Sequence, residues 1–184
     1  MAQHPSLSTR VLLTCAAIGV ATGLLSAGAG YLSVAVAAGL PLFYGLILGA
    51  HVLPGVVAQA LLRQAWVALV THLIAALVAS ALAPQWTPRF LGTAILIGGI
   101  QEGVAALSRY RRWEPWRFIV SALVIGAVLA ATIGLAADVG QFPVGAQIVY
   151  LALFLVSPAA WTVVGLAIAA ALRRAGVART RTGG

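Results

Sequence analysis

The chain has 184 residues, of which 62% are hydrophobic and only 8% are charged. A soluble domain carries about a quarter charged residues, so this composition cannot cover a water-facing surface and calls for lipid as solvent. The formal net charge is +8, but the arginines lie between apolar runs, which is the pattern of a membrane protein and not of a nucleic-acid-binding domain.

The apolar runs predict six membrane spans, because a span needs about 20 mostly apolar residues. In chain order they cover approximately residues 11–30, 41–62, 66–83, 90–108, 118–137 and 144–172. Residues 31–40 are expected to form a short segment of their own, and a polar tail, 173–184, closes the chain. The expected fold is therefore all-α, a single bundle of about six transmembrane helices in a lipid bilayer.

The arginines predict the orientation of the bundle, since cytoplasmic loops of membrane proteins are rich in basic residues. With the N-terminus in the cytoplasm, only Arg89 falls on the outer side. The inner side then holds Arg10, Arg63, Arg109, Arg111, Arg112, Arg117, Arg173, Arg174, Arg179 and Arg181. Both termini are thus expected to be cytoplasmic, in a bacterial plasma membrane. Cleavage after the signal-like segment Ala27-Gly28-Ala29 stays open, and it would leave five spans.

Several enzyme motifs are absent from the sequence. With no lysine, the phosphate-binding pattern GxxxxGK cannot occur, and the sequence has no HExxH, CxxC or GxSxG. We therefore expect no catalytic residues, no cofactor and no metal site. If the protein transports a solute, the energy must come from a partner or from an ion gradient.

Glu102 is the only acidic residue within a predicted span. A charge there costs at least about 2.5 kcal/mol, so it should face the interior of the bundle and have a partner. His72 lies at the same expected depth, roughly 9 Å from the inner ends of the two neighbouring spans. The sequence predicts a buried His72–Glu102 pair, which would be either a polar site for ligand or proton or a structural hydrogen bond.

The first span is rich in small residues. Ala17-xxx-Ala21 and Gly19-xxx-Gly23 both permit close approach of another helix, and Gly45-xxx-Gly49 repeats the pattern in the second span. The number of adjacent small positions in the first span favours contact with a helix of another protein.

Three segments resemble the YkoE family of substrate-binding (S) components of energy-coupling factor (ECF) transporters, which is associated with thiamine or its hydroxymethylpyrimidine precursor. They are Pro41-Leu42-Phe43-Tyr44-Gly45, the stretch from Leu62 to Leu77, and Gly98-Gly99-Ile100-Gln101 followed by Arg112-Trp113. The resemblance implies capture of a vitamin-type ligand from outside and docking onto a T subunit with two ATPase subunits. It also implies that Ala17 and Ala21 contact the T subunit.

The expected ligand cavity opens outward and is lined by aromatic and polar residues. The candidates are Tyr44, Trp86, Asp138 and Tyr150 in the outer half, with His51, Gln101 and Glu102 below. Other functions stay open: an S component for another vitamin, a self-sufficient proton-coupled transporter using His72 and Glu102, or a non-transporting scaffold.

Overall fold

The computed structural model describes residues 7–177, and only the backbone of 37–39 and 41. Every regular element in this range is helical. They are α1 (Thr9–Gly39), η1 (Pro41–Phe43), α2 (Tyr44–Leu48), η2 (Gly49–Val52), α3 (Leu53–Leu62), α4 (Val67–Leu82), η3 (Pro84–Trp86), α5 (Thr87–Leu107), α6 (Pro115–Ala136), η4 (Val139–Gln141) and α7 (Val144–Arg174). Within residues 7–177, five stretches are long and apolar enough to span a membrane, and α4 is a shorter apolar helix. The predicted all-helical membrane bundle is confirmed. The end of the predicted polar tail, residues 178–184 with Arg179 and Arg181, lies outside the described residues.

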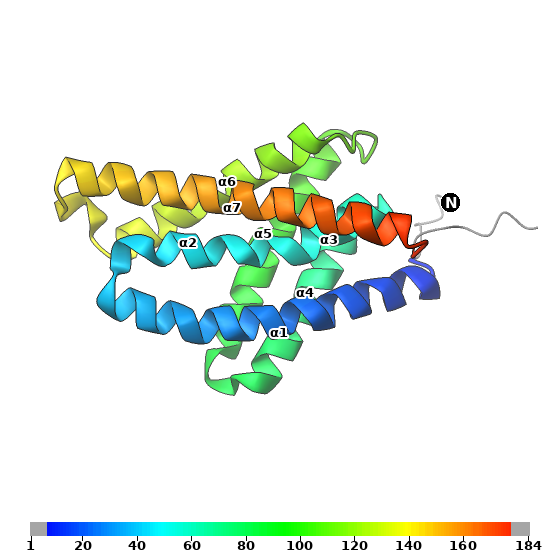
Figure 1. The fold of residues 1–184 in the computed structure, drawn as a ribbon, viewed down its shortest axis with the longest axis horizontal. Helices are drawn as coiled ribbons and strands as arrows, with labels where there is room; N and C mark the ends of the chain where they lie inside the picture. Colours follow the sequence, from blue (N-terminus) through cyan, green and yellow to red (C-terminus); the bar gives the residue numbers. More distant parts are fainter. Residues whose placement is uncertain (1–6, 178–184) are drawn as a thin grey trace, which may run out of the picture.

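The helices define two ends of the molecule. α1 begins and α7 ends at the same end, which we call the proximal end, and the opposite end is the distal end (Figure 1). α1, α2–α3, α6 and α7 run roughly along the long axis, whereas α4 and α5 cross them steeply (Figure 1). Arg117 at the start of α6 and Arg173 and Arg174 at the end of α7 are proximal, as the predicted grouping of basic residues requires.

Helix α1 is longer than the sequence predicts. It is continuous for 31 residues, so the expected separate segment 31–40 is wrong, and Tyr31 to Gly39 extend the first helix. In lipid, an interrupted helix would expose unpaired backbone N–H and C=O groups. The free-energy cost of exposing them outweighs the weak helix propensity of Gly28 and Gly30. Gly30 also packs on α5, since a Cβ at this position would lie 3.1 Å from the ring of Phe90.

Within the predicted second span, residues 44–62 form one apolar stretch. The 3₁₀ turn η1 precedes its helix, and the 3₁₀ turn η2 interrupts the helix once, between α2 and α3. The backbone comes so close to α7 that a Cβ on Gly45 or Gly49 would collide with Phe154 or Ser157. The Ser157 hydroxyl donates to the Leu46 carbonyl oxygen at 2.6 Å, which satisfies an acceptor beside the break. With 83% of an 18-residue window of this stretch buried, the interrupted helix is the centre of the bundle.

The two small-residue motifs of α1 face different partners. Gly19 and Gly23 face α4, where a Cβ on Gly23 would lie 2.7 Å from the Ala75 carbonyl oxygen. This motif is therefore used inside the bundle. Ala17 and Ala21 lie on the exposed side of α1, where no other helix of the described chain covers them.

Candidate ligand-binding site

A cavity of about 410 Å³ lies towards the distal end, between the last turns of α1, the start of α2, the start of α5, the end of α6 and the start of α7. This volume is within the range of small-molecule sites. Its lining is mostly apolar, with a few polar groups: Ser33, Val34, Tyr44, Arg89, Ile133, Ala137, Val139, Phe142 and Tyr150.

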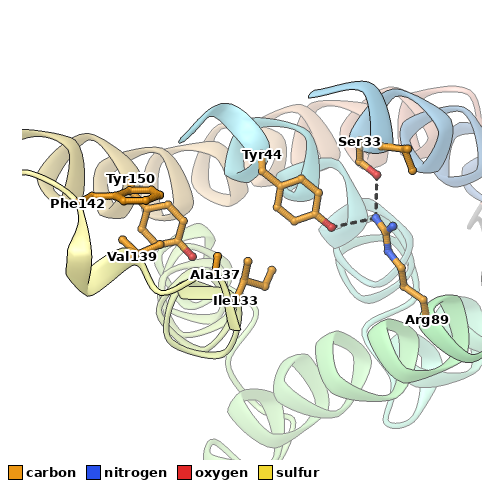
Figure 2. Close-up of a pocket in the computed structure, with 9 residues that line it drawn as sticks. Ser33, Tyr44, Arg89, Ile133, Ala137, Val139, Phe142 and Tyr150 are labelled. Atoms are coloured by element: carbon orange, nitrogen blue, oxygen red, sulfur yellow. Dashed lines mark hydrogen bonds between the residues drawn. The ribbon is translucent and has the colours of Figure 1, made fainter. Parts of the chain in front are cut away.

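Arg89 provides the charge of this cavity. It lies in the first turn of α5 and reaches across to α1 and α2 (Figure 2). Its Nη2 donates to the Ser33 hydroxyl at 2.7 Å and to the Tyr44 hydroxyl at 3.0 Å. Because Ser33 is fully buried, the guanidinium points into the protein and does not extend towards lipid headgroups.

The facing wall is aromatic and is held in place by backbone contacts. Figure 2 shows Tyr150, Phe142, Ala137 and Ile133 across the cavity from Tyr44 and Arg89. The Tyr150 hydroxyl donates to the Ala130 carbonyl oxygen at 2.9 Å, which fixes the ring between α6 and α7. The Phe142 backbone is tied to α7, because the side-chain amide of Gln147 donates to its carbonyl oxygen at 2.8 Å.

The structure brings some of the predicted ligand residues to this cavity and not others. Tyr44 and Tyr150 line it. Trp86 does not line it, and its ring packs against those of Tyr31 and Phe90, with centroids 4.9 and 6.4 Å away. Asp138 is exposed in the turn between the lining residues Ala137 and Val139, but does not line the cavity itself.

His51, Gln101 and Glu102 lie elsewhere. His51 and His72 border a separate void of about 20 Å³, enough for one water molecule and too small for a vitamin. Gln101 and Glu102 belong to a polar cluster nearer the proximal end. The three residues therefore do not form the floor of the distal cavity.

The predicted His72–Glu102 pair is wrong. His72 Nε2 instead bonds the Gln101 side-chain oxygen at 2.9 Å, and Gln101 in turn donates to the Val52 carbonyl oxygen at 3.0 Å. Neighbouring positions on a helix differ in direction by about 100°, so only one of Gln101 and Glu102 can face His72.

Glu102 binds the start of α4. Its carboxylate accepts hydrogen bonds from the backbone N–H groups of Trp66 at 3.0 Å and Ala68 at 2.8 Å, and from the Gln59 side chain at 3.2 Å. Trp66 has a φ of 69° and no side-chain cap of its own, so Glu102 from α5 takes the capping role. Gln59 connects this carboxylate to Arg117, whose Nη2 donates to Gln59 Oε1 at 3.1 Å.

Tyr110, in the loop between α5 and α6, lies near this cluster. Burial raises the pKa of its hydroxyl to about 12, and the negative charge of Glu102 acts in the same direction. The guanidinium of Arg117 opposes both effects and is itself stacked on Trp113, 4.6 Å from the ring centroid. The cluster is therefore a compact structural network of opposite charges.

An apolar groove of about 710 Å³ runs along α1, α3 and α7. Ala17 and Ala21 line it, together with larger apolar side chains such as Leu25, Leu61 and Ile168. Because small residues let helix backbones approach closely, the groove has the shape and chemistry to receive a helix of another membrane protein.

The sequence interpretation missed Arg89 and Ser33 as site residues. Arg89 was treated only as the exception to the charge rule, yet that exception was the available signal, because a basic residue on the wrong side of the membrane needs a local reason. Among residues 7–177, no group of three or more His, Cys, Asp or Glu side chains lies close enough to hold a metal ion.

Comparison with known proteins gives two matches. The family model described as "ABC-type cobalt transport system, permease component" matches residues 10–128. A solved structure described as "Crystal structure of an S-component of ECF transporter" is similar with a TM-score of 0.83 at 20% sequence identity, covering 94% of this chain and 88% of that chain. At this identity the likeness shows the fold, which is that of an S component. No curated protein sequence matches the chain.

Proposed function

The chain belongs to the family of ABC-type cobalt transport system permease components, and we propose that it is the substrate-capturing S component of an ECF-type importer. The observation that carries this proposal is the distal cavity with Arg89 and Tyr44 on one wall and Tyr150 on the other. A mostly apolar cavity with a few fixed polar groups is what a small-ligand site requires.

The arginine distribution supports an outward opening of this cavity. The proximal end carries the basic residues that favour the cytoplasm, and the cavity lies towards the other end. We propose that the ligand enters from outside the cell, across a bacterial plasma membrane.

The groove on α1, α3 and α7 is the proposed docking site for the T subunit, which would carry two ATPase subunits. Ala17 and Ala21 are exposed within it, which supports their predicted role as contacts. The proposed division of labour assigns capture to this chain and ATP hydrolysis to its partners.

The resemblance proposes thiamine or hydroxymethylpyrimidine as the ligand, and the lining of the cavity includes the aromatic side chains of Tyr44, Phe142 and Tyr150. The family description names cobalt, but the described residues offer no cluster of metal-ligating side chains. We therefore propose a vitamin-type organic ligand. The alternative of a proton-coupled transporter loses support, because His72 and Glu102 do not pair.

The proposal is tested by ligand binding and by assembly. Detergent-purified protein is heated with thiamine, hydroxymethylpyrimidine, riboflavin, biotin or Co²⁺. A ligand that binds only the folded state adds about 2.7 kcal/mol at a hundredfold excess over Kd. In parallel, the tagged chain is co-expressed with a T subunit and two ATPases of the same genome and purified.

Co-purification of the four chains together with stabilisation by a vitamin supports the S-component function. Stabilisation by Co²⁺ alone would replace the proposed substrate class with a metal ion. Failure to assemble, with no ligand bound by folded protein, would refute the function and favour a scaffold.

A further inference from the structure

The guanidinium of Arg89 lies at the cavity without an acidic partner. The chain has three acidic residues, and none of them lines the cavity. Glu102 caps α4, Glu114 lies in the proximal loop before α6, and Asp138 is exposed in the turn after α6. A partly buried charge within a membrane bundle is costly unless it is compensated, so the cavity has a charge to be neutralised.

The free polar groups around Arg89 are donors. Both described hydrogen bonds of Arg89 use Nη2, so Nε and Nη1 keep their N–H groups free of acceptors within residues 7–177. Ser33 already donates its hydroxyl hydrogen to the Gly30 carbonyl oxygen, and Tyr150 donates its hydrogen to Ala130.

Tyr44 differs from the other two hydroxyls. It accepts from Arg89, and its own hydrogen has no acceptor within the described part of the chain. The cavity therefore presents a guanidinium and a phenol O–H next to each other, and both require an acceptor on the ligand.

We propose that the cavity binds a small organic monocarboxylate, with its carboxylate on Arg89 and Tyr44 and its apolar body against Ile133, Phe142 and Tyr150. Arginine pairs with carboxylates through parallel, charge-assisted hydrogen bonds, and the remaining wall is apolar. This inference rests on the proposed function and specifies the ligand class of the same site. It disfavours thiamine and Co²⁺, because both are cations that Arg89 would repel.

A single guanidinium favours a monocarboxylate over a phosphate. A phosphate group carries up to two charges and three acceptor oxygens, and the described lining offers no second basic side chain. A lipid phosphate is disfavoured by direction, since Arg89 reaches inward to the fully buried Ser33.

The test compares carboxylates with their neutral counterparts on the intact detergent-purified chain. The probes are nicotinate and nicotinamide, biotin and biotinamide, and pantothenate and panthenol, with pyridoxal phosphate, thiamine and a short-chain phosphatidylglycerol as comparisons. We expect at least one carboxylate to stabilise the protein and to bind about 10- to 100-fold more tightly than its neutral partner.

The variants separate charge from geometry. Arg89→Gln should abolish the preference for the carboxylate, Arg89→Lys should retain part of it, and Tyr44→Phe should weaken binding by about two- to tenfold. Arg111→Gln, on the exposed proximal loop, is the matched control and should bind as the unaltered protein does. The melting temperature of each variant without ligand shows whether it remains folded.

Equal binding of carboxylate and neutral partner, or the absence of binding by every carboxylate, would overturn the inference. Preferential binding of pyridoxal phosphate or of the lipid would overturn it in favour of a phosphate ligand. In each of these cases, assembly with the T subunit and ATPases would leave the S-component function standing, and loss of that assembly would refute the function as well.

Discussion

Replacing Glu102 by glutamine should destabilise the bundle without touching the ligand cavity. The carboxylate faces three N–H donors, from Trp66, Ala68 and Gln59. A glutamine amide keeps one acceptor oxygen but turns an NH₂ group towards a donor, which leaves at least one buried N–H unsatisfied. Glu102→Gln also removes the negative charge at the start of α4, where the helix dipole favours an anion.

The magnitude follows from these two losses. An unsatisfied buried donor costs about 1–3 kcal/mol and the lost charge at a helix start about 0.3–2 kcal/mol. We expect Glu102→Gln to lower the free energy of unfolding by about 2–4 kcal/mol, which for a chain of this size corresponds to roughly 5–15 °C in melting temperature.

The assay is thermal unfolding in detergent, followed by circular dichroism, with ligand binding measured separately. Glu114→Gln is the matched control, because Glu114 is exposed and its side chain caps no backbone N–H group at the start of α6; its effect should stay within about 0.5 kcal/mol. A melting temperature for Glu102→Gln within about 2 °C of the unaltered protein would refute the capping argument. A loss of ligand affinity in a fully stable variant would instead return Glu102 to the binding site.

Three further predictions test other parts of the structure. Gly126→Ala should cost about 1–3 kcal/mol in unfolding experiments, because the new methyl group meets the backbone of α7 at Phe154, whereas Gly99→Ala, with open space around it, should be nearly neutral. Ala21→Trp should fill the apolar groove and abolish co-purification with the T subunit while ligand binding persists. The control Leu123→Trp, at a lipid-facing position outside the groove, should leave both co-purification and ligand binding unchanged. The pKa of the Tyr110 hydroxyl is about 12 in the folded protein and about 10 in the unfolded chain. The protonated hydroxyl therefore stabilises the fold fully below pH 10, and this stabilisation is lost as the pH rises through 12. Tyr110→Phe should remove the part of the alkaline fall in melting temperature that this titration causes.

The helices were largely predictable from the sequence because lipid leaves the backbone few alternatives. The predicted spans 66–83, 118–137 and 144–172 lie within a few residues of α4, α6 and α7. The extension of α1 past Gly30 was not predicted, since the glycines look like helix breakers until the contact with Phe90 is known.

The site was less predictable, because its contacts depend on side-chain direction and on backbone partners. Equal depth suggested that His72 faces Glu102, but depth does not specify which side of α5 a residue occupies. The actual partners of Glu102 include two backbone N–H groups, which no residue pattern reveals. Tyr44 and Tyr150 were selected as outer aromatic residues, and the cavity contains both.

The unequal helix lengths have a consequence for how the protein sits in a bilayer. α1 and α7, with 31 residues each, are about 46 Å long, whereas α4, with 16 residues, is about 24 Å long. A hydrocarbon layer of about 30 Å is too thin for the first two and too thick for the third. One orientation of the molecule therefore cannot match all of its helices to this layer, and we expect its inclination in the bilayer to depend on membrane thickness.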